Sequence, residues 1–150
     1  MKAVVTRVNS ASVSIDGQLH GAIGRGFLIL LGIGPEDTPA LCRKLAEKIL
    51  GLRVFRDEND KMNLSLADVG GSVLVVSQFT LYGDCKKGYR PSFIGAAAPD
   101  VAIPLYEQFL QECRDHGFEP QHGEFGAEMQ VESVNDGPVT IWLDTDVLMQ

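Results

Sequence analysis

Hydrophobic and polar residues alternate along the first third of the chain, a spacing that predicts β-strands. Residues 11–15 alternate, Asp16-Gly17 supplies a two-residue turn, and residues 18–23 alternate again, which is the pattern of a β-hairpin. The uninterrupted apolar run at 27–33 then predicts a buried strand. We therefore expect the N-terminal third to be rich in β-structure.

Two segments carry apolar residues every three or four positions, the spacing of an amphipathic helix. In the first, Thr38 is suited to the N-cap, Pro39 to the first helical position, and Gly51 to the end of the helix. The second covers roughly residues 100–116, and Pro104 is expected in its first turn, where a missing N–H is tolerated. We therefore expect two main helices.

Further strands are predicted between and after the helices. Residues 52–55 form a short apolar run, and the run that begins at Val73 is apolar enough for a strand buried on both faces. Near the C-terminus, residues 125–134 alternate, 135–138 favour a turn, and 139–143 return as a strand. The last part of the chain is therefore expected to form a hairpin.

The order of these elements predicts the fold class. Strands come first, followed by two strand–helix units and then more strands, with no repeat or linker to divide the chain. Two helices cannot cover both faces of so many strands, so part of the sheet should pack against other strands. We expect residues 1–150 to form a single α/β domain, a three-layer α/β/β arrangement with mixed β-sheets and two main helices.

Cysteine usage and hydropathy indicate a soluble protein of a reducing compartment. Cys42, Cys85 and Cys113 are odd in number and widely spaced, which fits neither a disulfide framework nor a zinc site. The longest apolar run, 27–33, is far too short to cross a bilayer, and the first residues lack the apolar core of a signal peptide. We therefore expect a cytoplasmic protein with no membrane partner.

Candidate chemistry gathers where the strand that begins at Val73 ends. Ser77, Gln78 and Thr80 follow the apolar run directly, and in sheets with parallel strands ligands bind outside the carboxyl ends of the strands. Because side chains alternate along a strand, Gln78 and Thr80 would share one face, and Ser77 and Phe79 the other. The alternative is that these groups only satisfy nearby backbone donors and acceptors.

A basic loop comes next, in a chain that is otherwise acidic. Thirteen Lys and Arg against twenty Asp and Glu give a net charge of -7, which argues against a protein that wraps long nucleic acid. Lys86, Lys87 and Arg90 nevertheless lie close together, interleaved with Tyr89 and Phe93, and cations with aromatic residues suit a short phosphodiester end and its stacked bases. The alternative is a solvated surface loop.

The segment from Asn135 to Thr140, NDGPVT, is the third unusual stretch. Asn-Asp-Gly is ordinary hairpin chemistry, but Pro138 removes a donor from the ladder and biases Gly137 away from the helical region. Such a tip exposes backbone carbonyl groups. The alternative is an edge-strand turn without further function.

Several catalytic signatures are missing from the sequence. The chain contains no GxSxG, P-loop or HExxH motif, and we expect neither a metal nor a cofactor. Thr80 is a candidate nucleophile, but a threonine hydroxyl needs a nearby base, and the sequence offers no obvious one.

Taken together, VSQFTL and NDGPVT resemble the two signature motifs of the D-aminoacyl-tRNA deacylases, SQxTL and NxGPVT. The resemblance extends over nearly the whole chain, through MKAVVTRVNSASVSIDG, DKMNLSL, KGYRPSF, AAAPD and FGAEMQV. Only the tail, DTDVLMQ, lies outside it.

The resemblance implies a cytoplasmic homodimer that hydrolyses the ester between a D-amino acid and the 3′ end of tRNA, a chiral proofreading step in translation. It implies a cis Gly137-Pro138 peptide, inserted into the partner's site, whose carbonyl groups exclude an L side chain while a D side chain or glycine is accepted. It also implies that Arg7 holds this loop, and that Lys86, Lys87 and Arg90 hold the terminal nucleotides.

The same resemblance implies a pocket lined by Phe79, Ala102, Phe125 and Met129. Within the candidate catalytic segment Ser77–Thr80, we expect backbone N–H groups near Phe79 and Thr80 to stabilise the oxyanion. Gln78 would orient the ester, and water would attack with help from the 2′-hydroxyl of the tRNA.

Two other classes of function stay open from the residues alone. A non-catalytic module that binds the tRNA end would use the same basic loop but leave the ester intact. A small-molecule esterase or amidase with Thr80 as nucleophile would act without RNA and form a covalent acyl intermediate.

Overall fold

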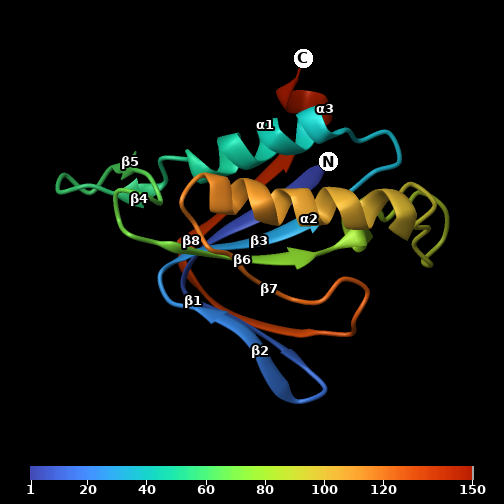
Figure 1. The fold of residues 1–150 in the computed structure, drawn as a ribbon, viewed down its shortest axis with the longest axis horizontal. Coiled ribbons are helices and arrows are strands. Elements are labelled where there is room, and N and C mark those ends of the chain that lie inside the picture. The colour runs from blue at the N-terminus through green and yellow to red at the C-terminus, as the bar shows by residue number, and fades with distance from the viewer. Residues whose placement is uncertain (150) are drawn as a thin grey trace.

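The computed structural model describes residues 1–149 and contains eight strands, three α-helices and one 3₁₀-helix (Figure 1). In chain order the elements are β1 (Lys2–Ile15), β2 (Gln18–Ile23), β3 (Gly26–Gly32), α1 (Pro39–Leu50), β4 (Phe55–Arg56), β5 (Met62–Leu64), β6 (Ser72–Ser77), η1 (Phe79–Tyr82), α2 (Pro99–Asp115), β7 (Gln121–His122), β8 (Gln130–Asp144) and α3 (Thr145–Leu148). No helix within residues 1–149 is both long and apolar enough to cross a membrane.

The main sheet is mixed and is organised by the long strand β1. Its strand order is β2-β1-β3-β6-β7, and β8 also pairs with β1. The first half of β1 pairs antiparallel with β3 and the second half with β2, whereas β3–β6 and β6–β7 are parallel pairs. In Figure 1 the second half of β1, with β2 and part of β8, lies beneath β3 and β6, while α1 and α2 lie above them.

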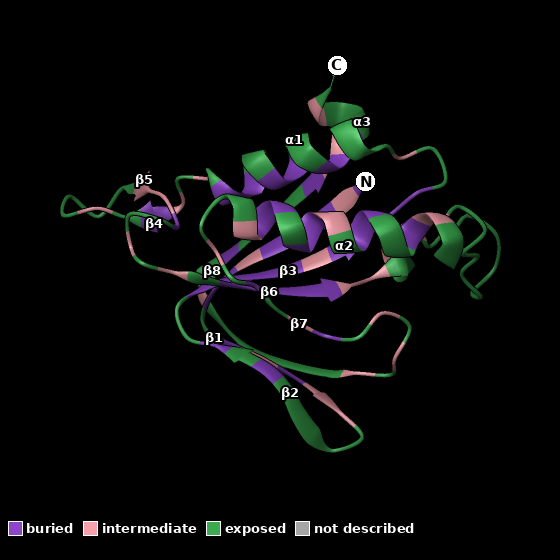
Figure 2. Cartoon of the chain, viewed as in Figure 1, coloured by how far each residue is buried: buried purple, intermediate pink, exposed green. Residues whose placement is uncertain are grey.

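Apolar side chains on both faces of β3 and β6 hold three layers together. Those in the cluster beneath the helices include Phe27, Ile29, Leu31, Val73 and Val75. Those in the opposite cluster, shared with the second half of β1, include Leu28, Leu74 and Val76. Figure 2 accordingly shows β3, β6 and the inner faces of both long helices as buried. The predicted three-layer α/β/β arrangement with two main helices is confirmed.

The first long helix begins and ends where the sequence predicts. Thr38 is its N-cap and accepts the N–H of Leu41 at 3.3 Å, Pro39 is its first residue, and Gly51 follows its last. In α2, by contrast, Pro104 lies in the second turn rather than the first, because the helix begins at Pro99. Pro104 is exposed, so water can satisfy the carbonyl group that its missing N–H leaves free.

The predicted C-terminal hairpin is wrong, because β8 is one continuous strand. Residues 130–135 pair with 8–14 and residues 140–144 pair with 2–6, so both halves are antiparallel to β1. A long first strand offers a partner to each half, and the turn-forming residues between them bulge outward instead of reversing the chain. The predicted strand at 52–55 is likewise shorter, since β4 contains only Phe55 and Arg56.

Two of the three cysteines are core residues. Cys42 and Cys113 lie in the facing helices and are buried, whereas Cys85 is exposed. Burial raises the pKa of the Cys42 thiol to about 12 and that of Cys113 to about 12. Both thiols are therefore neutral at physiological pH and act as small apolar groups.

Candidate active site

The polar segment at the end of β6 leaves the sheet sooner than predicted. Ser77 is the last strand residue, and the N–H of Gln78 still donates to the Leu31 carbonyl at 2.7 Å. The chain then turns into η1, in which Leu81 N donates to the Gln78 carbonyl at 3.2 Å. The predicted alternation of faces through Thr80 is therefore wrong, because β3 ends at Gly32 and offers no further partner.

Two glycines, one at the end of β3 and one just after it, allow η1 to approach. A Cβ on Gly32 would lie 3.0 Å from the Gln78 carbonyl oxygen, and one on Gly34 would lie 2.9 Å from the Tyr82 hydroxyl. Contacts this short are tighter than nearly all real Cβ contacts. The sequence LGIG thus fixes the position of η1 against the carboxyl end of β3.

The start of η1 presents free hydrogen-bond donors. Within residues 1–149, the backbone N–H groups of Phe79 and Thr80 have no acceptor, as is usual for the first residues of a helix. Both residues are exposed, and the side-chain amide of Gln78 contacts the Thr80 hydroxyl. Two adjacent donors and an amide therefore border the same surface.

A cleft opens beside these donors and has two parts. Both parts are lined by Ser77, Gln78, Phe79 and Gly126. The smaller, mainly apolar part adds Leu31, Ile33, Ala97, Ala102 and Phe125. The larger part, of about 440 Å³, adds Val76, Thr80, Ala127, Glu128, Met129 and Val131.

The cleft brings together residues that are far apart in the sequence. Ser77–Thr80, Ala102, Phe125 and Met129 all line it. Sequence reasoning missed Ile33 and Ala97, which are joined by a 2.9 Å backbone hydrogen bond. The signal available for Ile33 was its place after a strand parallel to β6, because parallel strands end at the same edge.

Helix α2 fixes the apolar wall of the cleft. The Tyr106 hydroxyl donates to the Val75 carbonyl at 3.1 Å, which ties α2 to the middle of β6. Burial raises the pKa of this hydroxyl above its ordinary value, so it stays protonated. The Tyr106 ring also packs on Phe125, with centroids 5.9 Å apart, and so supports a cleft residue from behind.

No general base is hydrogen-bonded to Thr80 within residues 1–149, although the Glu128 carboxylate belongs to the same part of the cleft. Gln78 is the only hydrogen-bond partner of the Thr80 side chain among residues 1–149. The ring centroids of His20 and His122 lie 6.0 Å apart, but both residues line a different hollow, of about 270 Å³, behind Phe125. Residues 1–149 also contain no group of three or more His, Cys, Asp or Glu placed to hold a metal ion.

The bulge in β8 is anchored on a buried arginine. Thr6 opposes Thr140 and Val8 opposes Asn135, so Arg7 alone faces the four residues 136–139, which we call the bulge. Arg7 is 3% exposed. Its Nε donates to the Asp136 carbonyl at 3.2 Å and lies 3.2 Å from the Asp136 carboxylate. The guanidinium therefore holds the bulge both by a hydrogen bond and by charge.

Further contacts shape the bulge. Arg7 Nη1 donates to the Val54 carbonyl at 2.6 Å. The Asn135 side chain accepts the N–H of Val139 and donates to the Thr140 hydroxyl, both at 3.0 Å. Gly137 has a φ of +127°, and its peptide bond to Pro138 is cis, the isomer that the sequence resemblance implies. Gly137 and Pro138 are exposed at the tip.

The bulge and the cleft of one chain lie apart on the sheet. Arg7, beneath the bulge, is in register with Phe27 and Val73, whereas the cleft begins at Ser77, beside Leu31. Four residues along the strands amount to about 13 Å, and the three strand spacings from β8 to β6 add about 14 Å across. One chain therefore does not bring its own Gly137-Pro138 tip into its own cleft.

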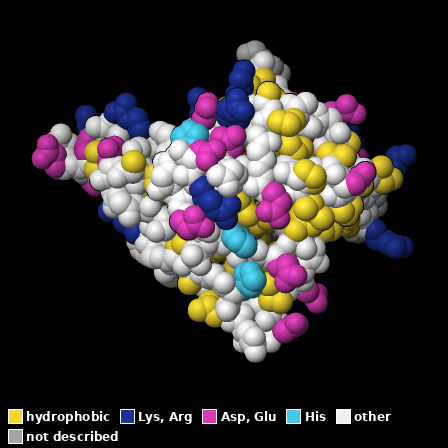
Figure 3. Space-filling model, in the orientation of Figure 1, with side chains coloured by type: hydrophobic (Ala, Val, Ile, Leu, Met, Phe, Trp, Pro, Cys, Tyr) yellow, Lys and Arg dark blue, Asp and Glu magenta, His cyan; other side chains and the backbone are white. Residues whose placement is uncertain are grey.

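The predicted basic loop stands at the rim of the cleft. Lys86, Lys87 and Arg90 are all exposed. The loop that carries them follows η1, and Phe93 packs edge-on against Phe79 with ring centroids 5.3 Å apart. Figure 3 shows Lys and Arg side chains standing out beside a hydrophobic cluster at the right edge, where Figure 1 has the loop before α2.

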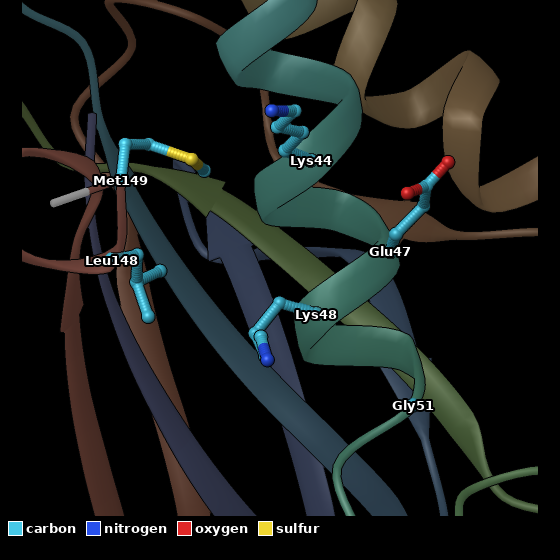
Figure 4. A pocket seen from close by; sticks show the side chains of 6 residues that line it. All are labelled: Lys44, Glu47, Lys48, Gly51, Leu148 and Met149. Carbon is cyan, nitrogen blue, oxygen red and sulfur yellow. The ribbon is translucent and has the colours of Figure 1, made fainter.

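A separate groove of about 490 Å³ lies between α1 and α3 (Figure 4). It is lined by Lys44, Glu47, Lys48, Gly51, Leu148 and Met149. The two lysines reach from α1 toward the side of α3, and the glutamate points away from them. The groove has no residue in common with the cleft, so we treat it as a surface feature.

Comparison with known proteins gives a consistent result. A family model described as D-Tyr-tRNA(Tyr) deacylase matches residues 4–144. A protein of Koribacter versatilis named D-aminoacyl-tRNA deacylase is 58% identical, and one of Thermosipho africanus with the same name is 54% identical, each over 97% of both chains.

Solved structures share the fold. One titled c-Myc DNA Unwinding Element Binding Protein is 46% identical, with a TM-score of 0.90 over 96% of this chain and 98% of that one. Another, titled a probable eukaryotic D-amino acid tRNA deacylase, is 17% identical, with a TM-score of 0.83 over 95% and 97%. The second likeness concerns the fold alone.

Proposed function

The chain belongs to the D-aminoacyl-tRNA deacylase family, and from this membership we propose that it hydrolyses the ester between a D-amino acid and the 3′ end of tRNA. The products are free D-amino acid and tRNA, and mischarged glycyl-tRNA is accepted as well. The observation that carries the proposal is the cleft in which the free donors of Phe79 and Thr80 meet an apolar hollow. Because aminoacyl-tRNA is a substrate of translation, the protein is expected to act in the cytoplasm, with residues 1–150 as a single domain.

The chemistry needs little from side chains, because an aminoacyl ester is already activated. Water attacks the ester carbonyl carbon, the N–H groups of Phe79 and Thr80 bind the oxyanion that forms, and the 3′-oxygen of the tRNA leaves with a proton. Gln78 orients the ester, and the neighbouring 2′-hydroxyl of the tRNA assists the water. Neither a metal nor a cofactor takes part.

The protein acts as a homodimer in which each Gly137-Pro138 tip enters the cleft of the partner. The separation of tip and cleft within one chain supports this arrangement, since a second copy is needed to join them. The exposed carbonyl groups of the tip face the α-carbon of the bound residue. An L side chain collides with them, whereas a D side chain points away, so that selectivity comes from exclusion.

A direct assay tests the activity. Purified protein is expected to hydrolyse D-tyrosyl-tRNA and to leave L-tyrosyl-tRNA intact under the same conditions. Equal binding of charged and uncharged tRNA without hydrolysis would show a non-catalytic module instead. Hydrolysis of simple esters through a trapped acyl-enzyme would show a Thr80 nucleophile.

Mixed dimers test the shared site. One variant would carry a blocked cleft (Ala102→Trp) and an intact tip, and the other an intact cleft and a tip displaced by Gly137→Ala, whose Cβ would lie 2.9 Å from Val139 Cγ2 and 3.0 Å from Arg7 Nη2. After subunit exchange, each heterodimer has one site made of two intact halves. We expect rejection of L-tyrosyl-tRNA to return at that site, and no such recovery would refute the cross-subunit arrangement.

Thr80→Ala is expected to retain at least about a third of the wild-type kcat, because the backbone N–H survives the substitution and the hydroxyl is hydrogen-bonded to the Gln78 amide rather than to a base. Single-turnover hydrolysis of D-tyrosyl-tRNA measures this rate. Gln78→Ala is the matched comparison, since it removes the other half of the same contact. A drop of several orders of magnitude in Thr80→Ala, with tRNA binding unchanged, would make the hydroxyl the nucleophile.

Neutralising the basic loop is expected to weaken tRNA binding. In Lys86→Gln/Lys87→Gln/Arg90→Gln, KM should rise more than kcat falls, and the slope of log K against log[salt] should flatten by about 2, since each phosphate contact on a single strand contributes about 0.7. Binding titrations at several salt concentrations measure the slope. Lys44→Gln/Lys48→Gln, in the groove of Figure 4, should leave it unchanged.

A further inference from the structure

The loop that carries the basic residues has a built shape. Asp84 and Ser92 exchange two backbone hydrogen bonds, of 2.8 and 2.9 Å, which close its neck. The Asp84 carboxylate accepts the N–H of Lys86 at 2.9 Å, and Gly88 takes a φ of +65° at the tip, a conformation that glycine adopts without strain. The loop is therefore a small hairpin with its own hydrogen bonds.

This hairpin is joined to the cleft through its neck. Phe93 packs on Phe79, which lines both parts of the cleft. Gly83, directly after η1, lies so close to Phe93 that an added Cβ would be 3.2 Å from the ring. The hairpin thus stands at a fixed place on the rim, next to the donors at the start of η1.

Tyr89 is the residue of this hairpin that folding does not explain. Its side chain is fully exposed, so its ring contributes nothing to the core. Lys87 and Arg90 lie close to it in the sequence. An exposed aromatic ring among cations is the arrangement by which proteins stack unpaired bases while holding the phosphates between them. Bases within a duplex do not offer their faces in this way.

The position of Tyr89 indicates which nucleotides it reaches. It lies three residues from Ser92 at the neck, a reach of at most about 10 Å at ~3.3 Å per residue, because residues 86–90 form bends and not a strand. That reach corresponds to at most about three stacked nucleotides at ~3.4 Å each. We propose that Tyr89 is a stacking platform for the unpaired nucleotides that precede the esterified one, an inference that rests on the proposed function.

The test compares substrates that do and do not reach the platform. Tyr89→Ala should raise KM for D-tyrosyl-tRNA between about fivefold and a hundredfold. It should leave hydrolysis of D-tyrosyl-adenosine, the esterified terminal nucleoside alone, unchanged. Tyr89→Trp should restore KM because it restores a stacking surface. Ile94→Ala, which alters an equally exposed apolar residue of the same region (92% exposed), should have no effect.

Two further measurements separate stacking from other roles. The salt dependence of tRNA binding should be the same in Tyr89→Ala as in the wild type, because a neutral ring releases no counterions. Wild-type protein should bind an uncharged RNA stem with an unpaired 3′ tail more tightly than a blunt stem, and Tyr89→Ala should lose that preference.

The outcomes distinguish the inference from the function on which it rests. The stacking role would be refuted if Tyr89→Ala lost activity equally on D-tyrosyl-tRNA and D-tyrosyl-adenosine, or if its KM for the tRNA were unchanged. It would also be refuted if Tyr89→Trp failed to restore that KM. A tail preference that depends on Tyr89, in a protein that cleaves no ester, would support the platform and refute the deacylase activity.

Discussion

Replacing Arg7 with methionine is expected to lower the free energy of unfolding by about 3 kcal/mol, because two carbonyl groups lose a buried donor at once. These are the carbonyls of Val54 and Asp136, which accept from Nη1 and Nε at 2.6 and 3.2 Å. Chemical denaturation measures the change. The same variant should lower the ratio of D- to L-tyrosyl-tRNA hydrolysis by about tenfold or more. This change corresponds to a loss of about 1.4 kcal/mol in the free-energy difference by which the site discriminates between the two substrates.

Two neighbouring substitutions serve as controls. Asp136→Asn keeps an oxygen acceptor beside the guanidinium and removes only a carboxylate that is 38% exposed, so it should cost about 1 kcal/mol or less. Arg7→Lys keeps the charge but cannot supply two donors in a fixed fork, so it should behave more like Arg7→Met. A stable Arg7→Met protein with full discrimination would show that the bulge does not depend on this side chain.

Gly26→Ala is expected to destabilise the protein by about 4 kcal/mol, which is at the upper end of the effects of single substitutions, because the added Cβ conflicts with backbone atoms in a packed core. A Cβ at this position would lie 1.8 Å from the Ser72 carbonyl oxygen and 2.7 Å from its nitrogen. Gly26 and Ser72 are the first pair of the parallel β3–β6 ladder, and backbone atoms cannot turn aside as a side chain does. The strand that leads to the cleft would lose its alignment.

Thermal unfolding checks this prediction. For a chain of 150 residues, a loss of about 4 kcal/mol corresponds to a fall in Tm of about 8–16 °C. Gly24→Ala is the matched control, because an added Cβ there meets nothing within 4 Å, and it should change stability by less than about 0.5 kcal/mol. Equal melting temperatures for the two variants would contradict the argument.

Elements with local signals could be predicted from the sequence. The N-cap at Thr38 and the glycine after the first helix act within one turn of chain. Asp16 and Gly17 both take positive φ, of 51° and 76°, as a two-residue hairpin requires. Such signals do not depend on which distant segment packs against them, so reading them needs no knowledge of the fold.

Elements whose form depends on a distant partner could not be predicted. The NDGP sequence favours a hairpin, but β1 is long enough to pair with both sides of it, and the ladder outweighs the local turn. Thr80 follows a strand-like run, yet β3 ends first and the chain coils into η1. In the same way the sequence brings Ser77–Thr80 to attention but does not reveal Ile33, which joins the cleft only because β3 lies beside β6.

The bulge in β8 also makes the register of its first half with β1 independent of the register of its second half, whereas in a strand without a bulge the two would be linked. In a regular strand one inserted residue turns every later side chain to the opposite face. Here each half of β8 is aligned by its own stretch of β1, on either side of Arg7, so the number of residues between Asn135 and Thr140 fixes neither half. An extra residue at the tip would therefore leave the register of both halves unchanged, but it would move the Gly137-Pro138 carbonyl groups on which the proposed exclusion depends.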